Sequence, residues 1–166
     1  GYSISIVDKI DTLVGFFVID EKPTSSKDPF ALRRAAIGLL RIIIENKLSF
    51  KLRDLISYAI RLYQEQGVEI KNEKTEQQVL EFIKERMRNV LKLKNIKTDV
   101  IEASISSHAG DNFLALYAKT LLMNKYKNKG IGLNAINSYK RASNILDKAG
   151  KRITGRPDAV LFRKDE

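Results

Sequence analysis

The chain has 166 residues, enough for one ordinary domain or two small ones with a sizeable buried core. Hydrophobic residues make up 43% of it and charged residues 30%, which excludes a disordered polyelectrolyte, and no apolar run approaches the roughly 18 residues of a membrane span. The formal net charge of +10 makes a polyanionic partner the first hypothesis to test. Without cysteine there is no disulfide framework and no thiolate zinc site, and without signal-peptide features the expected compartment is the cytoplasm.

Most of the positive charge lies in the last third of the chain. Residues 1–50 carry seven basic and six acidic side chains, and residues 51–110 carry eleven and nine. Residues 111–166 carry twelve basic side chains against five acidic ones. This distribution fits either a solvated face that aids solubility or a surface that binds phosphate groups.

Apolar residues recur at three- and four-residue steps almost throughout, which predicts an all-α helical bundle. The first helix is expected over 4–19, followed by a polar loop at 20–27. Asp28 as N-cap and Pro29 at the first helical position predict the start of a second helix, which runs to about Asn46. Because this helix is apolar almost all round, we expect it to be the central one.

A third helix is expected over about 51–66, and Gly67 supplies its C-terminal stop. The following segment, 68–74, is charged and lacks periodicity. We therefore predict that it links two helical regions, residues 1–67 and residues 75–166.

The second region is expected to begin with a fourth helix, because Thr75 and Gln78 have the spacing of a capping box. Two shorter helices follow, one from Thr98 or Asp99 to Ile105 and one that starts at Asp111. The apolar side chains of the latter that we expect to turn inward are Phe113, Leu114, Tyr117, Leu121 and Leu122.

A last helix is expected over about 133–149, with two chemically different faces. At about 100° per residue its apolar side chains gather on one side, and amide and cationic side chains gather on the other. The members of this polar arc are Asn137, Lys140, Arg141, Asn144 and Lys148. The arc contains no acid, so it suits RNA phosphates, and its amides could hydrogen-bond unstacked bases.

A shorter basic run precedes that helix. Tyr126 stands between Lys125 and Lys127, and an aromatic ring among cations is a candidate for stacking on an RNA base. Together with the polar arc, these three residues complete the predicted RNA-binding set.

No complete catalytic or metal site is visible. His108 is the one histidine, and metal binding through imidazole needs further ligands at close spacing. Asp8 and Asp11 lie three residues apart, as paired acids or metal ligands do, but solvation at the surface explains this spacing better, since the charge of Asp8 suits a helix N-terminus. Arg33 and Arg34 either reach the surface, pair with a carboxylate of the first helix, or meet a phosphate. We therefore predict no catalytic and no metal-ligating residue.

Two long segments carry a resemblance to a known family, residues 8–17, DKIDTLVGFF, and residues 26–36, SKDPFALRRAA. Both closely resemble the β subunit of bacterial tetrameric glycyl-tRNA synthetase. Residues 82–86, 99–103 and 139–146 are similar to later segments of that subunit, in the same order. Since the chain is much shorter than that subunit and begins without Met, the resemblance implies a C-terminal fragment.

The resemblance also implies a function. In that family two α subunits carry the class II active site, which uses ATP and Mg to make glycyl-adenylate, and two β subunits bind tRNA(Gly) within an α2β2 heterotetramer. A β fragment would be non-catalytic and would bind no cofactor itself, with tRNA(Gly) and the α subunit as partners and neither membrane nor DNA. Residues 1–67 resemble the end of an HD-like domain, and residues 75–166 resemble the DALR-type anticodon-binding domain shared with arginyl-tRNA synthetase.

Two alternatives stay open. Asp8 matches the last metal-ligating aspartate of catalytic HD phosphohydrolases, so the chain could be the remnant of such an enzyme, although the upstream His and His-Asp parts of that motif are absent here. The chain could also be a structural module, in which residues 30–44 and the third helix pack on the α subunit.

Overall fold

A computed structural model describes residues 1–24, 27–28, 30–108 and 110–128. Within these ranges the chain forms helices and no strand, which confirms the predicted all-α class. The helices are α1 (Tyr2–Val18), α2 (Leu32–Glu45), α3 (Leu52–Glu65), α4 (Thr75–Lys92), α5 (Thr98–Ser106) and α6 (Phe113–Asn128). None of these described helices is both long and apolar enough to cross a membrane.

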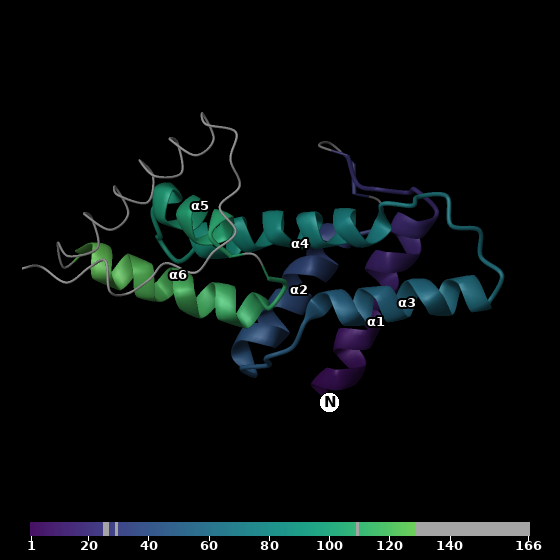
Figure 1. Ribbon diagram of the computed structural model, residues 1–166, viewed down its shortest axis with the longest axis horizontal. Coiled ribbons are helices and arrows are strands. Elements are labelled where there is room, and N and C mark those ends of the chain that lie inside the picture. Colours follow the sequence, from purple (N-terminus) through teal and green to yellow (C-terminus); the bar gives the residue numbers. More distant parts are fainter. Residues whose placement is uncertain (25–26, 29, 109, 129–166) are drawn as a thin grey trace, which may run out of the picture.

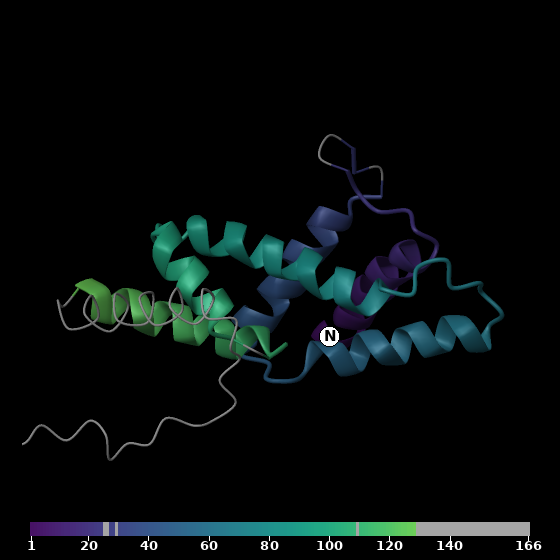
Figure 2. The ribbon, with the colours of Figure 1, turned by 45° about the horizontal axis from the view of Figure 1, so that its top comes forward.

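Helix α4 lies along the long axis of the molecule and connects its two ends (Figure 1). It packs against α1, α2, α3 and α5. Helices α3 and α4 run in opposite directions and are joined at one end, whereas α5 and α6 lie at the other end (Figure 2). Helix α2 packs against α1, α4 and α6, but α1 also contacts three helices and α4 contacts four, so α2 is an inner helix rather than the single central one.

One hydrophobic core extends through the described helices. The largest fully buried side chains come from every helix and include Leu13 of α1, Leu39 and Leu40 of α2, Ile56 of α3, Ile83, Met87 and Leu91 of α4, Ile101 of α5 and Leu116 of α6. Burial of such side chains is the main stabilising contribution to a helical bundle. Helices on both sides of residues 68–74 therefore share their buried surface.

The connection 68–74 is non-helical, as predicted, and it is fastened to α1. The backbone nitrogen of Lys71 donates to the carbonyl oxygen of Val18 at 3.0 Å. The buried amide of Asn72 donates to the carbonyl oxygen of Phe17 at 3.1 Å and to Oε1 of Gln78 at 3.0 Å. The division into two domains at this connection remains a prediction.

Helix α2 begins later than expected. Its first residue is Leu32 rather than Pro29, and the residue before it, Ala31, has a left-handed backbone with φ 54°. The Asp28 carboxylate still caps the helix, because it accepts hydrogen bonds from the backbone nitrogens of Leu32 at 2.8 Å and Arg33 at 3.1 Å. The prediction that Asp28 accepts hydrogen bonds at the start of this helix is therefore confirmed. The chain makes a turn after Asp28 before the helix begins, in which the backbone nitrogen of Ala31 donates to the carbonyl oxygen of Asp28.

The capping box predicted for the fourth helix is wrong. Thr75 is the buried first residue of α4, and its hydroxyl donates to the carbonyl oxygens of Asn72 at 2.6 Å and Phe17 at 3.3 Å. Oε1 of Gln78 accepts hydrogen bonds from Asn72 and Lys22. The nearby Asn72, together with Phe17 and Lys22 from a distant part of the sequence, thus replaces the pairing of Thr75 with Gln78.

Helix α6 turns Phe113, Leu114 and Tyr117 toward the core as predicted, but not Leu121 and Leu122. Phe113, Leu116 and Thr120 are buried, whereas Leu121 and Leu122 are exposed, so the inward orientation expected for those two leucines is wrong. They follow Thr120 by one and two positions, which rotates them by about 100° and 200° away from the buried stripe. A run of adjacent apolar residues does not say which of them faces the core.

Candidate nucleic-acid interface

The structure describes part of the predicted RNA-binding set. Lys125, Tyr126 and Lys127 lie in the last turn of α6. The polar arc of the last predicted helix lies outside the described residues, namely Asn137, Lys140, Arg141, Asn144 and Lys148. These five residues stay predictions.

The three residues at the end of α6 have different environments. Tyr126 exposes 52% of its surface, and Lys125 is exposed beside it. Lys127 keeps only 11% of its side chain exposed, because its ammonium forms an ion pair with the Asp99 carboxylate in the first turn of α5. Lys127 therefore holds α5 and α6 together, which leaves Lys125 and Tyr126 as the accessible pair.

A second group of cations lies in the turn between α4 and α5. Lys92, Lys94 and Lys97 are exposed there, and Leu93 exposes 85% of its surface. The turn is tight, since the backbone nitrogens of Lys94 and Asn95 donate hydrogen bonds of 3.0 and 2.9 Å within it. Helical periodicity gave no reason to single out these lysines, although counting charges over 92–97 would have shown three cations without an acid.

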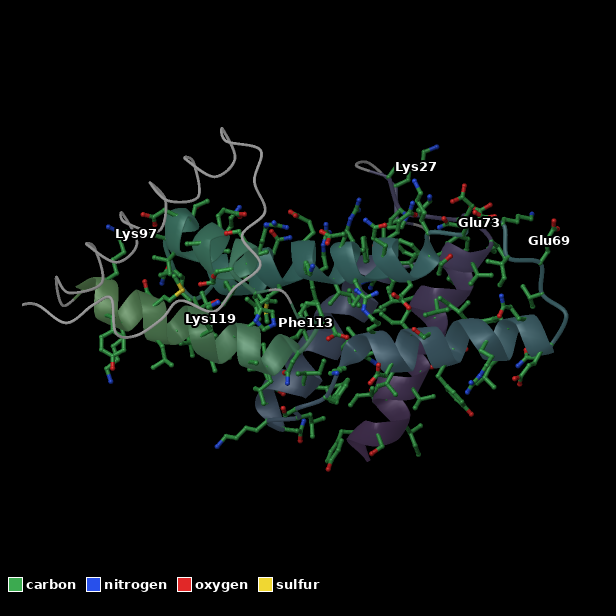
Figure 3. All side chains as sticks on the ribbon, in the orientation of Figure 1. Lys27, Glu69, Glu73, Lys97, Phe113 and Lys119 are labelled. Carbon is green, nitrogen blue, oxygen red and sulfur yellow. The ribbon has the colours of Figure 1, made fainter. Side chains whose placement is uncertain are left out.

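The two groups lie at the same end of the molecule. Lys97 is the N-cap of α5, two residues before Asp99, and Asp99 pairs with the residue that follows Tyr126. Figure 3 shows Lys97 at the end where α6 also ends. We use the name basic end for the set Lys92, Lys94, Lys97, Lys125 and Tyr126.

The acids around the basic end are occupied by other groups. Residues 92–128 contain three acids, of which Asp99 pairs with Lys127. Glu102 accepts from Arg88 at 3.0 and 3.3 Å, and this hydrogen bond raises the pKa of Arg88 above its ordinary value. Asp111 accepts a backbone hydrogen bond of 2.8 Å at the start of α3. The ion pairs of Asp99 and Glu102 are made with Lys127 and Arg88, neither of which belongs to the basic end.

The two aspartates of α1 do not form a metal site with their described neighbours. Asp8 is exposed, and Oδ1 of Asp11 accepts a hydrogen bond from the Tyr63 hydroxyl at 2.9 Å. Burial, with further contributions from this hydrogen bond and the Asp11 charge, raises the pKa of Tyr63 to about 12. The described residues contain no group of three or more histidine, cysteine, aspartate or glutamate side chains able to hold a metal ion.

The two arginines at the start of α2, Arg33 and Arg34, lie in different environments. The guanidinium of Arg33 donates to the carbonyl oxygen of Thr24, which fixes the loop before the helix, whereas Arg34 is exposed. Arg33 thus contributes to the local fold.

His108 is half-buried in the loop before α6. Its Nε2 is shielded from solvent and has no hydrogen-bond partner among the described residues. Burial lowers the pKa of the His108 imidazole, and the nearby Lys119 charge lowers it further. The neutral ring therefore fits this position better than the charged one.

The described helices and the exposed lysines of the basic end define a basic, all-helical protein. Comparison with known proteins identifies its family. A family model described as glycyl-tRNA synthetase beta subunit matches residues 1–106. The chain therefore belongs to the glycyl-tRNA synthetase β subunit family, which confirms the resemblance noted above.

Curated relatives named glycine–tRNA ligase beta subunit match almost the whole chain. The protein of Rickettsia canadensis is 39% identical over 159 residues, which cover 96% of this chain and 22% of the relative. The protein of Clostridioides difficile is 34% identical over 165 residues, which cover 99% of this chain and 23% of the relative. The chain thus spans about a fifth of the length of these relatives.

Proposed function

We propose that this chain is a tRNA-binding, non-catalytic part of a glycyl-tRNA synthetase β subunit. It supports the ATP-dependent attachment of glycine to tRNA(Gly) by the α subunit in the cytoplasm. Family membership supports a role in the ligase reaction. The exposed lysines of the basic end are the observation that supports a polyanionic ligand. The partners are tRNA(Gly) and the α subunit of an α2β2 heterotetramer, and ATP and Mg are used on the α subunit.

The physical basis of this function is charge neutralisation. Lysine and arginine side chains that meet phosphates release condensed counterions, so affinity falls steeply as the salt concentration rises. Such contacts fix position and register, and base recognition comes from hydrogen bonds and stacking with unpaired nucleotides. The basic end and the predicted arc with Lys140 and Arg141 would supply both kinds of contact.

The test uses the complete complex of α and β subunits. We expect the Lys140→Ala/Arg141→Ala variant to weaken tRNA(Gly) binding and its dependence on salt. Glycine-dependent pyrophosphate exchange, which reports adenylate formation on the α subunit, should stay unchanged. Removing residues 129–166 from the β subunit should have a larger effect of the same kind, because it removes the whole predicted arc. The described helical core is kept in this variant. Unchanged tRNA affinity in both variants would contradict the proposal.

A second candidate function, association with the α subunit, is favoured by an apolar face on α1 and α3. Ile4 exposes 76% of its surface, and Tyr58 is also exposed. Tyr2, Val7 and Leu55 line one shallow groove between these helices. Exposed apolar patches commonly mark sites of protein association. Since α2 packs against three other helices of the bundle, we expect α3 rather than residues 30–44 to make this contact.

The association function is tested by co-purification. Leu55→Glu/Tyr58→Glu should reduce recovery of the α subunit with the β subunit, whereas Gln64→Glu, at another exposed position of α3, should not. Full recovery with the double variant would contradict a role for this face.

A further inference from the structure

We infer that the groove along α1, on the side that faces α3, receives an amphipathic helix of the α subunit that carries lysine or arginine beside its apolar stripe. The inference rests on the second candidate function, association with the α subunit, and names the chemistry of the segment that makes the contact. The shallow groove at Tyr2 continues in two further hollows that reach Ile19, and we call all three together the acidic groove.

The acidic groove follows the whole length of α1. Its first two hollows share Ser3 and Val7, and its second and third share Asp11. The 17 residues of α1, at about 1.5 Å each, give the groove a length of about 25 Å. This length suits a partner helix of about four to five turns, and a helix laid in an apolar groove is a recurring mode of recognition.

Exposed apolar side chains on both helices have helical spacing. The two helices run in the same general direction, because Leu55 lines the first hollow with Val7 and Tyr63 reaches Asp11 further along. Side chains three and seven residues after Leu55 share its face of α3. The exposed apolar set is Ile4 and Val7 on α1 and Leu55, Tyr58 and Leu62 on α3. Two such stripes leave gaps into which the side chains of a third helix can pack.

The charge of the groove favours a basic partner. Its charged residues are Asp8 and Asp11, and no described residue that lines it is a cation. Asp8 exposes 72% of its side chain and lies 4.0 Å from the Lys9 ammonium, a surface ion pair of a kind that contributes little. The Asp8 carboxylate is therefore available to an ammonium or guanidinium of the partner.

The α3 side of the groove adds no net charge at the neighbouring turn. Arg61 lies over the Tyr58 ring, 5.1 Å from its centroid, and its guanidinium is 3.9 Å from the Glu65 carboxylate. Because these two charges offset each other, the cations of the partner should face α1 rather than α3.

The experiment measures the dissociation constant of the α and β subunits at several salt concentrations. Asp8→Lys should weaken association about tenfold at low salt, Asp8→Asn should weaken it less, and both losses should shrink as the salt concentration rises. Glu81→Lys is the matched control, because this exposed acid also faces a neighbouring lysine, Lys84, but lies on α4, which lines none of the three hollows. It should associate as the unmodified subunit does.

The outcomes separate this inference from the proposed function. Equal effects of Asp8→Lys and Glu81→Lys would overturn the basic partner. The proposed association would still stand if Leu55→Glu/Tyr58→Glu lowered recovery of the α subunit. Unchanged association in that double variant as well would overturn the contact itself.

Ile4 tests the apolar part of the contact without threatening the fold. It is largely exposed and lies in the first turn of α1, where there is no acid, so Ile4→Glu suits the helix dipole. Ile4→Glu should weaken association while the melting temperature of the β subunit is unchanged or higher, and Ile4→Leu should retain association. Equal association of the two variants would overturn the apolar contact.

Photo-crosslinking identifies the occupant. With p-benzoylphenylalanine in place of Ile4, the α–β complex should give a crosslink to an α-subunit peptide that has lysine or arginine among apolar residues at steps of three and four. A crosslink to a peptide of the β subunit, or to an α-subunit peptide without a cation, would overturn the inference.

Discussion

The Tyr63 hydroxyl donates a hydrogen bond of 2.9 Å to Oδ1 of Asp11 and thereby joins α3 to α1. Gly15 lies one turn further along α1, and a Cβ atom at that position would lie 2.5 Å from the same hydroxyl oxygen. The absence of a side chain at Gly15 is therefore what lets the tyrosine approach the helix.

Removing this hydroxyl should destabilise the chain. We expect Tyr63→Phe to lower the free energy of unfolding at neutral pH by about 1 kcal/mol, as measured by urea denaturation. The pKa of Tyr63 is raised from 10.0 to about 12, so the folded state holds the phenol proton more tightly than the unfolded chain does. Its contribution is complete below pH 10 and is lost as the pH rises through 12. An equally steep loss over this range in Tyr63→Phe would contradict the assignment.

Two glycines of the bundle should respond oppositely to alanine. Alanine is usually favoured over glycine inside a helix by about 0.5–1 kcal/mol. Gly15→Ala should nevertheless destabilise, because it displaces the Tyr63 hydroxyl from Asp11. At Gly38 the nearest atom is Cε of Lys9 at 2.9 Å, which a flexible side chain can move, so Gly38→Ala should be neutral or stabilising. Thermal melting of both variants checks this, and a stabilised Gly15→Ala would refute the tyrosine explanation.

Asn72 should be the most sensitive polar residue of the connection between α3 and α4. Asn72→Ala removes two donated hydrogen bonds and leaves the backbone nitrogen of Lys74 without its 3.1 Å acceptor. Since the site is buried, we expect a loss of about 2 kcal/mol in urea unfolding. Asn89→Ala, at an exposed position of α4, is the control and should change little.

The cap supplied by Asp28 should depend on its acceptor rather than on its charge alone. Asp28→Ala should cost about 1 kcal/mol because two backbone nitrogens at the start of α2 lose their partner. Asp28→Asn keeps one acceptor oxygen and should retain much of the stability. Circular dichroism during thermal unfolding measures both, and equal losses would show that charge dominates.

The single histidine gives a measurable pH dependence. Because the pKa of His108 is lowered on folding, the folded state binds fewer protons than the unfolded chain. Stability should be complete above pH 6.5, the ordinary pKa, and should fall as the pH drops below it. His108→Leu should remove this decline, and NMR titration of the one imidazole follows the group directly. A pKa above 6.5 in the folded chain would contradict the burial argument.

Periodicity was sufficient to locate the helices, since it depends only on neighbouring residues. The stop at Gly67, for example, is confirmed by its left-handed backbone with φ 78°. The details that were missed depend on partners far away in the chain. Thr75 donates to Phe17 rather than pairing with Gln78, and Lys127 pairs with Asp99. No local rule contains those partners.

The candidate interface likewise contains one part that neighbouring residues predict and one part that depends on partners far away in the chain. The basic run at the end of α6 was visible as a local pattern, whereas its neighbour, the turn with Lys94 and Lys97, adjoins it only after folding. The packing of α5 on α6 creates this adjacency, and that packing depends on buried contacts such as the hydrogen bond from Ser104 to Met123.

Helix α4 also sets a fixed length within the molecule. Its 18 residues correspond to about 27 Å from Thr75 to Lys92. Thr75 is held between α1 and the connection by buried hydrogen bonds, so this end of the helix cannot slide freely. A displacement of Lys92 at one end of α4 would therefore be transmitted through the helix to Thr75 and its hydrogen bond with α1.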